Sequence, residues 1–507
     1  MSASKKKQLR QNAGPSKQEA LAKEQAAAYK KKVRTYTIIG IVIAVLVALL
    51  LVWNSGLIQR NQTAATVGDA KYTVNDVNYY YQAARYNAFY IYSYLGYEYP
   101  SDDEIMDTES GQTYREYFLE TSLKNLTDIT ALYDDAIKAG YSNADVADAV
   151  SEQIKSTKEY ASQQGYSYKA FLKMQFGRHM TPAAYKSILT KSTVVDRYYS
   201  DHAETLEYSD EALNLYYNEN KDDLDTYDYS YIYFTPVEVS AGEDVAEEVV
   251  AEMKAAALAD AELNAKMALD QVQGGTDIAE VAKSYTDASF TPHSKIVGNS
   301  LSSVYGEELK ALKKGEAVLV ENSGNGYYVI VLHDRALSDS CSVDVRHILV
   351  NAAYTMGEDG KRIAPTPAEW TKAQTKIEEI QAEYLNGQQT EEAFAALAEK
   401  YSEDTGSNTK GGLYEAVPQG EFVTEFDKWL FEEDHKVGDI GIIKHEAGQD
   451  DTNVYYGYHL AYYAGETATW KVTAQNALTS ADLTEWVQGL TGGYAAEYTS
   501  AVKYVAE

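Results

Sequence analysis

The sequence predicts a multidomain protein of the α+β class whose chain begins with an apolar helix. Three features predict this architecture. An apolar run follows a basic leader, residues 64–225 carry apolar side chains at helical spacing, and the remaining chain shows the order strand, helices, strand twice. A chain of 507 residues is too long for one hydrophobic core, so about three or four domains are expected.

The apolar run occupies residues 35–54 and contains no charged residue from Tyr36 to Trp53. This length is sufficient to cross a hydrocarbon core of about 30 Å, so we expect a transmembrane anchor. Residues 1–34 form a basic tail with ten Lys or Arg and two Glu. The positive-inside rule places this tail in the cytoplasm and the rest of the chain outside, as in a single-pass cell-membrane protein.

A cleaved signal peptide is the alternative to this anchor, because Thr63, Ala64 and Ala65 form a small-residue cleavage site. The leader is long and basic, however, and the site lies about ten residues beyond the apolar run. Both properties favour an uncleaved anchor. The anchor with an acidic exterior suits a single-membrane envelope, and a periplasmic setting is the alternative.

The part of the chain beyond the basic tail is strongly acidic. The tail carries a net charge of +8 and the whole chain −31, so the remainder carries −39. Nucleic acids and anionic lipid surfaces bind clustered Lys and Arg, so neither is an expected partner, and the charge is explained by solubility. Cys341 is the only cysteine, so no internal disulfide is expected and the fold depends on packing.

Residues 64–225 are expected to form a helical domain without convergent catalytic groups. One helical face ahead of the stop residue Gly140 carries Leu119, Leu123, Leu126, Tyr133 and Ile137. Residues 467–507 are expected to contain a C-terminal helix that docks on this domain. Its apolar stripe, between Ser480 and Val505, consists of Leu483, Trp486, Val487 and Leu490.

Residues 226–338 and 339–466 repeat one order of elements, which indicates a duplication. The apolar positions persist between the two copies, whereas three polar positions of the second copy change in the first. In the alignment of the two copies, His347 corresponds to Tyr231, Asp404 to Ala288, and His459 to Tyr328. The first copy is therefore interpreted as a scaffold whose site has been emptied.

The segment VDVRHILV, at residues 343–350, places His347 on a strand face that is otherwise apolar. Alone, this histidine would be a core residue and Asp404 a turn residue. Their occurrence with His459 in matching segments favours a functional site. A metal site is the less favoured alternative, because the three residues are 57 and 55 positions apart, whereas metal-binding triads usually take two ligands from one short stretch.

Four successive segments resemble the signature segments of parvulin-type peptidyl-prolyl isomerases: VRHILV, FAALAEKYSEDTGSNTKGG, QGEFVTEF and YGYH. The resemblance covers roughly residues 341–465. The anchor, the helical domain and the C-terminal helix also resemble the PrsA and SurA group of extracytoplasmic foldases. This implies a helical chaperone domain at 64–225, a degenerate, inactive parvulin-like domain at 226–338 and an active one at 339–466, each an antiparallel sheet with helices.

The resemblance also implies roles for individual residues. The catalytic positions are His347, Asp404 and His459, and the substrate-binding positions are Tyr414, Phe422 and Phe426 in the proline pocket and Tyr456 beside it. The sequence departs from the family pattern in an insertion at residues 445–453 and in Leu413, where aspartate is usual. These departures affect the rim and the specificity of the site more than its chemistry.

The implied reaction needs no nucleophile, metal or cofactor. Resonance gives the X–Pro amide bond a barrier of about 18–20 kcal/mol, so the catalyst must favour the twisted amide over both planar forms. We expect His347 and His459 to share a hydrogen-bond network that fixes their tautomers. We expect Asp404 to lie beside the rotating carbonyl group.

These observations together predict a peptidyl-prolyl isomerase and chaperone that assists the folding of secreted proteins outside the cytoplasmic membrane. Its partners would be unfolded or partly folded polypeptides that contain X–Pro bonds. The alternative is an ATP-independent holdase with little or no isomerase activity, because the first copy keeps the scaffold without the polar residues. The sequence leaves open whether the chain is a monomer or a homodimer.

Overall fold

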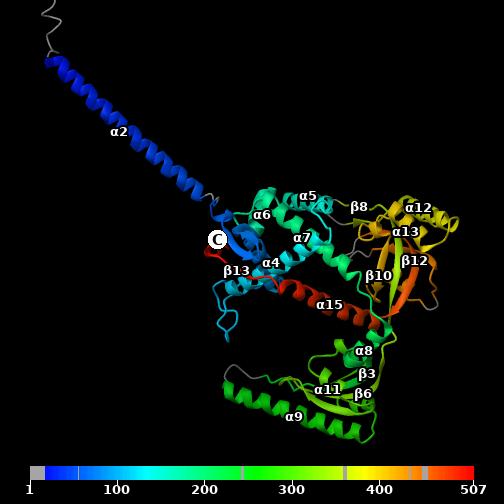
Figure 1. The fold of residues 1–507 in the computed structure, drawn as a ribbon. Coiled ribbons are helices and arrows are strands. Elements are labelled where there is room, and N and C mark those ends of the chain that lie inside the picture. Colours follow the sequence, from blue (N-terminus) through cyan, green and yellow to red (C-terminus); the bar gives the residue numbers. More distant parts are fainter. Residues whose placement is uncertain are drawn as a thin grey trace, which may run out of the picture. The chain divides into compact units, whose positions relative to one another are not determined.

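The computed structural model describes residues 17–54, 56, 58–240, 245–357, 362–432, 435–447 and 455–506 (Figure 1). The chain divides into two compact units. The first unit comprises Met1–Leu206 with Ala481–Glu507, and the second comprises Glu207–Ser480. Residues 1–16 of the basic tail and residues 448–453 of the predicted insertion lie outside the described residues.

Helix α2 (Lys17–Asn54) contains the predicted apolar run. Within the described residues, its segment Tyr29–Val52 is the one stretch long and apolar enough to cross a membrane, with 24 residues and a mean hydropathy of 2.8. The hydroxyl groups of Thr35 and Thr37 donate to backbone carbonyls one turn earlier, at 2.9 and 2.8 Å, so the helix satisfies its own polar groups. By length and composition, this helix is consistent with a membrane anchor.

The first unit contains a three-stranded antiparallel sheet that the helical periodicity of residues 64–225 does not predict. Strand β1 (Thr63–Val67) follows the short 3-10 helix η1 (Gln59–Asn61) and lies between β2 (Ala70–Thr73) and β13 (Ala496–Tyr498). Gly68 has a φ of +54° in the tight turn after β1, a conformation that favours glycine. The sheet thus joins segments from opposite ends of the chain.

Five helices complete the first unit: α3 (Val74–Leu95), α4 (Tyr114–Lys138), α5 (Ala147–Gln163), α6 (Tyr168–Phe176) and α7 (Pro182–Ala203). Thr73 and Thr113 begin α3 and α4 with capping boxes, in which side chain and backbone satisfy each other at the helix start. The core between these helices is largely aromatic and aliphatic, and its fully buried members include Tyr81, Phe118, Leu126, Leu172 and Met180.

The C-terminal helix differs from its predicted extent. Helix α15 spans Thr469–Thr491, and the chain beyond it forms β13 and the 3-10 helix η4 (Ser500–Tyr504) instead of continuing as a helix to Val505. Gly492 and Gly493 follow the last helical turn, and glycine loses more conformational entropy in a helix than any other residue. Pairing with β1 then satisfies the backbone of residues 496–498.

The second unit contains two four-stranded antiparallel sheets. The first has the order β4-β3-β6-β5 and the second β10-β7-β12-β11, so the two topologies are the same. The first sheet consists of β3 (Asp225–Phe234), β4 (Ala288–Val297), β5 (Ala317–Glu321) and β6 (Tyr327–Leu337). The second consists of β7 (Cys341–Asn351), β10 (Leu413–Val417), β11 (Ile440–Glu446) and β12 (Tyr456–Ala468). We call residues 225–337 the first module and residues 341–468 the second module.

Each module carries helices between its strands. The first has α9 (Glu247–Gln273), α10 (Ile278–Ala282), η2 (Gly298–Ser300) and α11 (Gly306–Lys310). The second has the small hairpin β8 (Thr355–Met356) and β9 (Arg362–Ile363), then α12 (Pro367–Leu385), α13 (Glu391–Tyr401), η3 (Asn408–Lys410) and α14 (Thr424–Leu430). Helix α8 (Asp210–Leu224) precedes the first module. The predicted α+β multidomain class is confirmed.

Strand alternation divides the second module into two apolar layers. On one sheet face, Ile348 and Leu460 pack with residues of α12 and α13, including Ile377 and Phe394. On the opposite face, Val343, Val345, Ala461 and Tyr463 pack with Phe426 and Leu430 of α14. The residues of β7 and β12 on this second face have odd numbers, as do His347 and His459, so the sheet directs both imidazoles toward α14.

Candidate active site

The site is built on the two central strands of the second module. His347 on β7 lies opposite Ala461 on β12, and His459 lies opposite Leu349, so the two histidines are diagonal neighbours on one face. The backbone amide of His347 donates to the carbonyl of Gly412 at 2.9 Å. Gly412 has a φ of +73°, and a Cβ atom there would overlap the carbonyl oxygen of His347, so only glycine permits this approach.

The two imidazoles contact each other directly. The Nδ1 atoms of His347 and His459 are 3.0 Å apart, and their rings stack at an interplanar angle of 15°. His347 is 4% exposed and His459 2%. Burial, with a smaller contribution from His347, lowers the pKa of His459 well below its ordinary value. His459 is therefore neutral at physiological pH.

Asp404 binds the other nitrogen of His347. It lies in the loop between α13 and η3, with its Oδ2 atom 2.9 Å from His347 Nε2. The Ser407 and Tyr414 hydroxyls donate to the same oxygen, and the Gly406 amide donates to Oδ1 at 3.2 Å. The His347 hydrogen bond, together with those from Ser407 and Gly406, holds the pKa of Asp404 well below its usual range. Asp404 is accordingly a carboxylate.

The charges of Asp404 and His459 determine where each proton lies. A carboxylate only accepts hydrogen bonds, so His347 donates through Nε2, and in the tautomer that carries this one proton its Nδ1 atom is an acceptor. His459 then donates through Nδ1, and its Nε2 atom accepts from the Tyr455 hydroxyl at 3.0 Å. Burial raises the pKa of Tyr455 to about 12, so this hydroxyl keeps its proton. One consistent set of tautomers satisfies the whole chain from Asp404 to Tyr455.

Aromatic rings surround this chain of hydrogen bonds. Phe426 stacks on both imidazoles, with ring centres 5.6 Å from His347 and 4.9 Å from His459. Phe422 lies 4.9 Å from Phe426 and 5.2 Å from Tyr414. Phe426 is fully buried, whereas Phe422 and Tyr414 are partly exposed, so these two present the aromatic surface to an incoming chain. A prolyl ring is an apolar group of suitable kind for such a surface.

The structure does not bring Tyr456 into this site, which corrects the role expected for it. Tyr456 lies three positions before His459, so strand alternation turns it to the opposite face, where it packs against Trp370. The residue before it, Tyr455, shares the parity of His459 and forms the hydrogen bond. The period-two pattern of YYGYH contained this signal. Ser407 was also missed, because a serine in the turn SEDTGS resembles an ordinary loop residue.

The predicted insertion begins with a third buried histidine, which lies beside the site. His445 is 5% exposed, and its Nδ1 atom lies 3.2 Å from a carboxylate oxygen of Glu425. Its ring lies 4.6 Å from that of Tyr455, so it supports the tyrosine that orients His459. Within the described part of the chain, no group of three or more His, Cys, Asp and Glu is arranged to hold a metal ion.

The first module has tyrosines at the equivalent positions. Tyr231 lies opposite Ile330 and Tyr328 opposite Tyr233, the same diagonal arrangement as the histidine pair. Their rings are 5.1 Å apart and both contact Tyr305, which precedes Leu309 by four positions as Phe426 precedes Leu430. Tyrosine rings replace both imidazoles, and the described residues of this module form no carboxylate–imidazole chain at these positions.

Residues 327–450 match the family described as the PPIC-type PPIASE domain. These residues are therefore similar to a parvulin-type domain. The match confirms the expected resemblance, and three of the four sequence segments lie within it, whereas YGYH at residues 456–459 lies beyond it. The match begins in β6 and ends before β12, so it includes His347 and Asp404 but not His459.

The chain is also similar to SurA chaperones. The Methylobacillus flagellatus "Chaperone SurA" is 32% identical over 157 residues, which cover 29% of this chain and 32% of the relative. The chain thus spans about a third of the length of this relative. The Photobacterium profundum "Chaperone SurA" is 23% identical over 362 residues, covering 70% of this chain and 73% of the relative. Among solved structures, PrsA from Bacillus subtilis matches with a TM-score of 0.27 and 14% identity, covering 78% of this chain and 93% of that chain.

Proposed function

We propose that the protein is a peptidyl-prolyl cis–trans isomerase and chaperone that assists secreted proteins outside the cytoplasmic membrane. The observation that carries this proposal is the buried chain of hydrogen bonds from Asp404 through His347 and His459 to Tyr455, stacked on Phe426. A structural core would not require two hydrogen-bonded histidines, an ionised carboxylate and a tyrosine in one buried chain. The parvulin-type domain and the SurA relatives support the same function.

The proposed mechanism is non-covalent. In a planar X–Pro amide, resonance places negative charge on the carbonyl oxygen, and twisting about the C–N bond removes it. A fixed carboxylate beside that oxygen therefore destabilises both planar forms more than the twisted one, which lowers the barrier. Asp404 would provide this charge while Phe422 and Tyr414 hold the prolyl ring. His347 and His459 act as positioning residues that keep Asp404 ionised and aligned.

Proline-limited refolding of a substrate protein tests this proposal. With the full chain in detergent micelles, Asp404→Asn is expected to reduce the rate enhancement by about tenfold or more, because the fixed charge is lost. Tyr328→Phe in the first module is the matched control and is expected to leave the rate unchanged. Full activity in Asp404→Asn would show that this site does not catalyse isomerisation.

A holdase function without isomerisation is the second candidate. The tyrosines of the first module favour it, because they keep an aromatic site without the hydrogen-bonded trio. Suppression of aggregation by Asp404→Asn separates the two. If Asp404→Asn suppresses aggregation fully but no longer accelerates refolding, the protein has both functions and they depend on separate residues. If the native chain itself suppresses aggregation but does not accelerate refolding, the protein is a holdase.

We also infer a membrane anchor in α2, with the basic tail in the cytoplasm and both modules outside. The charge difference between residues 1–34 and the remainder supports this orientation. Protease added outside intact cells would then digest the modules but not a tag at the N-terminus. Digestion of that tag in intact cells would indicate the opposite orientation, with the N-terminus outside. The monomer and the homodimer are both compatible with this placement.

A further inference from the structure

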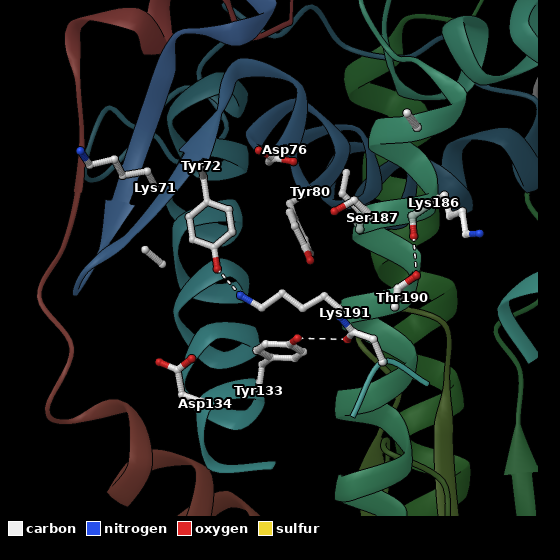
Figure 2. A pocket seen from close by; sticks show the side chains of 14 residues that line it. Lys71, Tyr72, Asp76, Tyr80, Tyr133, Asp134, Lys186, Ser187, Thr190 and Lys191 are labelled. Carbon is white, nitrogen blue, oxygen red and sulfur yellow. Dashed lines mark hydrogen bonds between the residues drawn. The ribbon is translucent and has the colours of Figure 1, made fainter. Parts of the chain in front are cut away.

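The first unit contains a cavity of about 650 Å³ that is separate from the candidate active site. Residues of β2, α3, α4 and α7 line it (Figure 2). Exposed residues of α7, among them Lys186 and Ser187, form part of its rim. The volume is within the range of about 300–1,000 Å³ that small ligands occupy, which corresponds to a few peptide residues.

Lys191 extends across this cavity from α7. Its ammonium group lies between two aromatic rings, with Nζ 5.0 Å from the ring centre of Tyr72 and 5.1 Å from that of Tyr133. It donates one hydrogen bond to the Tyr72 hydroxyl, which also contacts Thr130. Figure 2 shows the ammonium pointing into the cavity, whereas the ammonium of Lys186 points away from it.

The ammonium of Lys191 has no carboxylate partner among the residues that the structure describes. Two carboxylates line the cavity, and both serve the fold. Asp76 accepts from the amide and the hydroxyl of Thr73 at the start of α3, both at 2.7 Å. Asp134 accepts from the Tyr494 hydroxyl at 2.9 Å. Two N–H groups of an ammonium are thus available in a chain whose net charge is −31.

We propose that this cavity binds a carboxylate of an extended polypeptide, with Lys191 as the cationic partner and tyrosine rings as the wall. The proposal extends the proposed chaperone function. It rests on that function, because the chaperone function is the reason to expect a polypeptide as the ligand. A single ammonium suits a carboxylate better than a phosphate dianion, which usually requires several donors or an arginine fork. Tyr80 provides a further donor, because burial raises its pKa and keeps the hydroxyl protonated.

The test uses three short peptides and the full chain in detergent micelles, with affinities from isothermal titration calorimetry. The first is acetyl-Ala-Leu-Glu-Leu-Ala-amide, the second its Gln twin, and the third the Gln twin with a free C-terminal carboxylate. We expect the Glu peptide to bind at least about tenfold more tightly than the Gln twin, because a desolvated ion pair discriminates strongly against a neutral isostere. Tight binding of the third peptide instead would identify the C-terminal carboxylate as the recognised group.

Two substitutions assign the effect to Lys191. Lys191→Met keeps the aliphatic stem and is expected to abolish the preference for a carboxylate, whereas Lys191→Arg keeps the charge and is expected to restore most of it. Lys186→Met is the matched control on the same helix and rim, and is expected to keep the full preference. Circular dichroism verifies that each variant is folded. If a variant does not fold, the preference of the native chain for the Glu peptide still tests the proposal.

Equal binding of all three peptides to the native chain would overturn the proposal, as would a carboxylate preference that survives in folded Lys191→Met. Proline-limited refolding measured on the same samples keeps this test distinct from the proposed function. If the native chain lacks isomerase activity but binds the peptides as expected, the isomerase assignment fails and the carboxylate site stands. If the native chain and Lys191→Met are equally active isomerases but the native chain shows no preference for a carboxylate, the carboxylate site fails and the isomerase assignment stands.

Discussion

At the scale of single residues, the site depends on protonation states that neighbouring groups impose. Asp404 is kept ionised by His347, and His459 is kept neutral by burial. The neutral state of His459 preserves the contact with Tyr455, because a protonated His459 would no longer accept the hydrogen bond from its hydroxyl. The trio of His347, Asp404 and His459 was visible in the sequence because all three differ from the first copy. Tyr455 was not singled out by a comparison of the two copies, so its role became apparent only from the register of β12.

Tyr455→Phe tests the end of this chain of hydrogen bonds. The substitution keeps the ring but leaves His459 Nε2 without its donor, so the alternative tautomer becomes accessible. We expect a loss of about three- to tenfold in isomerase kcat/KM and a change in the imidazole ¹⁵N shifts. Tyr458→Phe, on the opposite face of β12, is the control and should change neither quantity. An unchanged kcat/KM in Tyr455→Phe would show that tautomer selection is unimportant.

The buried His459 makes the second module sensitive to acid. Its pKa is lowered in the folded state, whereas in the unfolded chain it is about 6.5. The resulting stability is fully present above about pH 6.5 and is lost as the pH falls toward the folded-state value, because the unfolded chain then binds a proton that the folded chain does not.

Hydrogen exchange of the β12 amides between pH 7.5 and pH 5 measures this effect. The free energy of opening should fall by up to about 1.4 kcal/mol per pH unit below pH 6.5. The fall should be smaller in His459→Gln, which has no proton to gain. Equal slopes in the two proteins would assign the pH dependence to another group.

At the scale of elements, strand register and close backbone contacts position the site. β7 and β12 place the histidines on one face, and β10 approaches His347 through Gly412. Alternation within β7 was readable from the sequence. The approach of β10 was not, since a KGG turn alone does not say which strand it contacts. The long-range pairing of β1 with β13 was missed for the same reason.

Gly412→Ala is expected to disturb the site through the backbone alone. The new Cβ would overlap the carbonyl of His347 at a positive φ, so we expect a loss of about 2–4 kcal/mol in the opening free energy of β7. Gly420→Ala is a matched control, because Gly420 also has a positive φ but no atom within 4 Å of the added Cβ. That variant should lose only about 1 kcal/mol. Hydrogen exchange of β7 distinguishes the two.

At the scale of the whole molecule, the chain returns to its beginning to complete the first unit. β13 pairs with β1, the Tyr498 hydroxyl donates to the carbonyl of Leu119 at 2.6 Å, and Ala501 and Val505 enter the core. The first unit therefore cannot finish folding until the last residues are present. Such a contact has a high loop-closure cost and predicts slow folding of this unit.

Deletion of residues 492–507 tests this dependence. Loss of β13 and η4 exposes one edge of β1 and part of the apolar core, so we expect rapid proteolysis within residues 64–206 and little change in the second module. Tyr498→Phe removes only one hydrogen bond and should remain resistant. Equal resistance of the deletion variant would mean that the first unit folds without the C-terminal segment.

The sequence by itself determined the polar trio, from the contrast between two copies, the aromatic residues around it, from their resemblance to parvulin segments, and the apolar run of α2, from its composition. These are local or periodic properties, which a linear pattern contains. Only the tertiary structure decided on which face Tyr455 and Tyr456 lie, that β13 joins β1, and that Lys191 lies between two tyrosine rings with no carboxylate partner among the described residues. The first depends on the register of β12, and the other two depend on contacts between segments distant along the chain, which packing of the whole core sets.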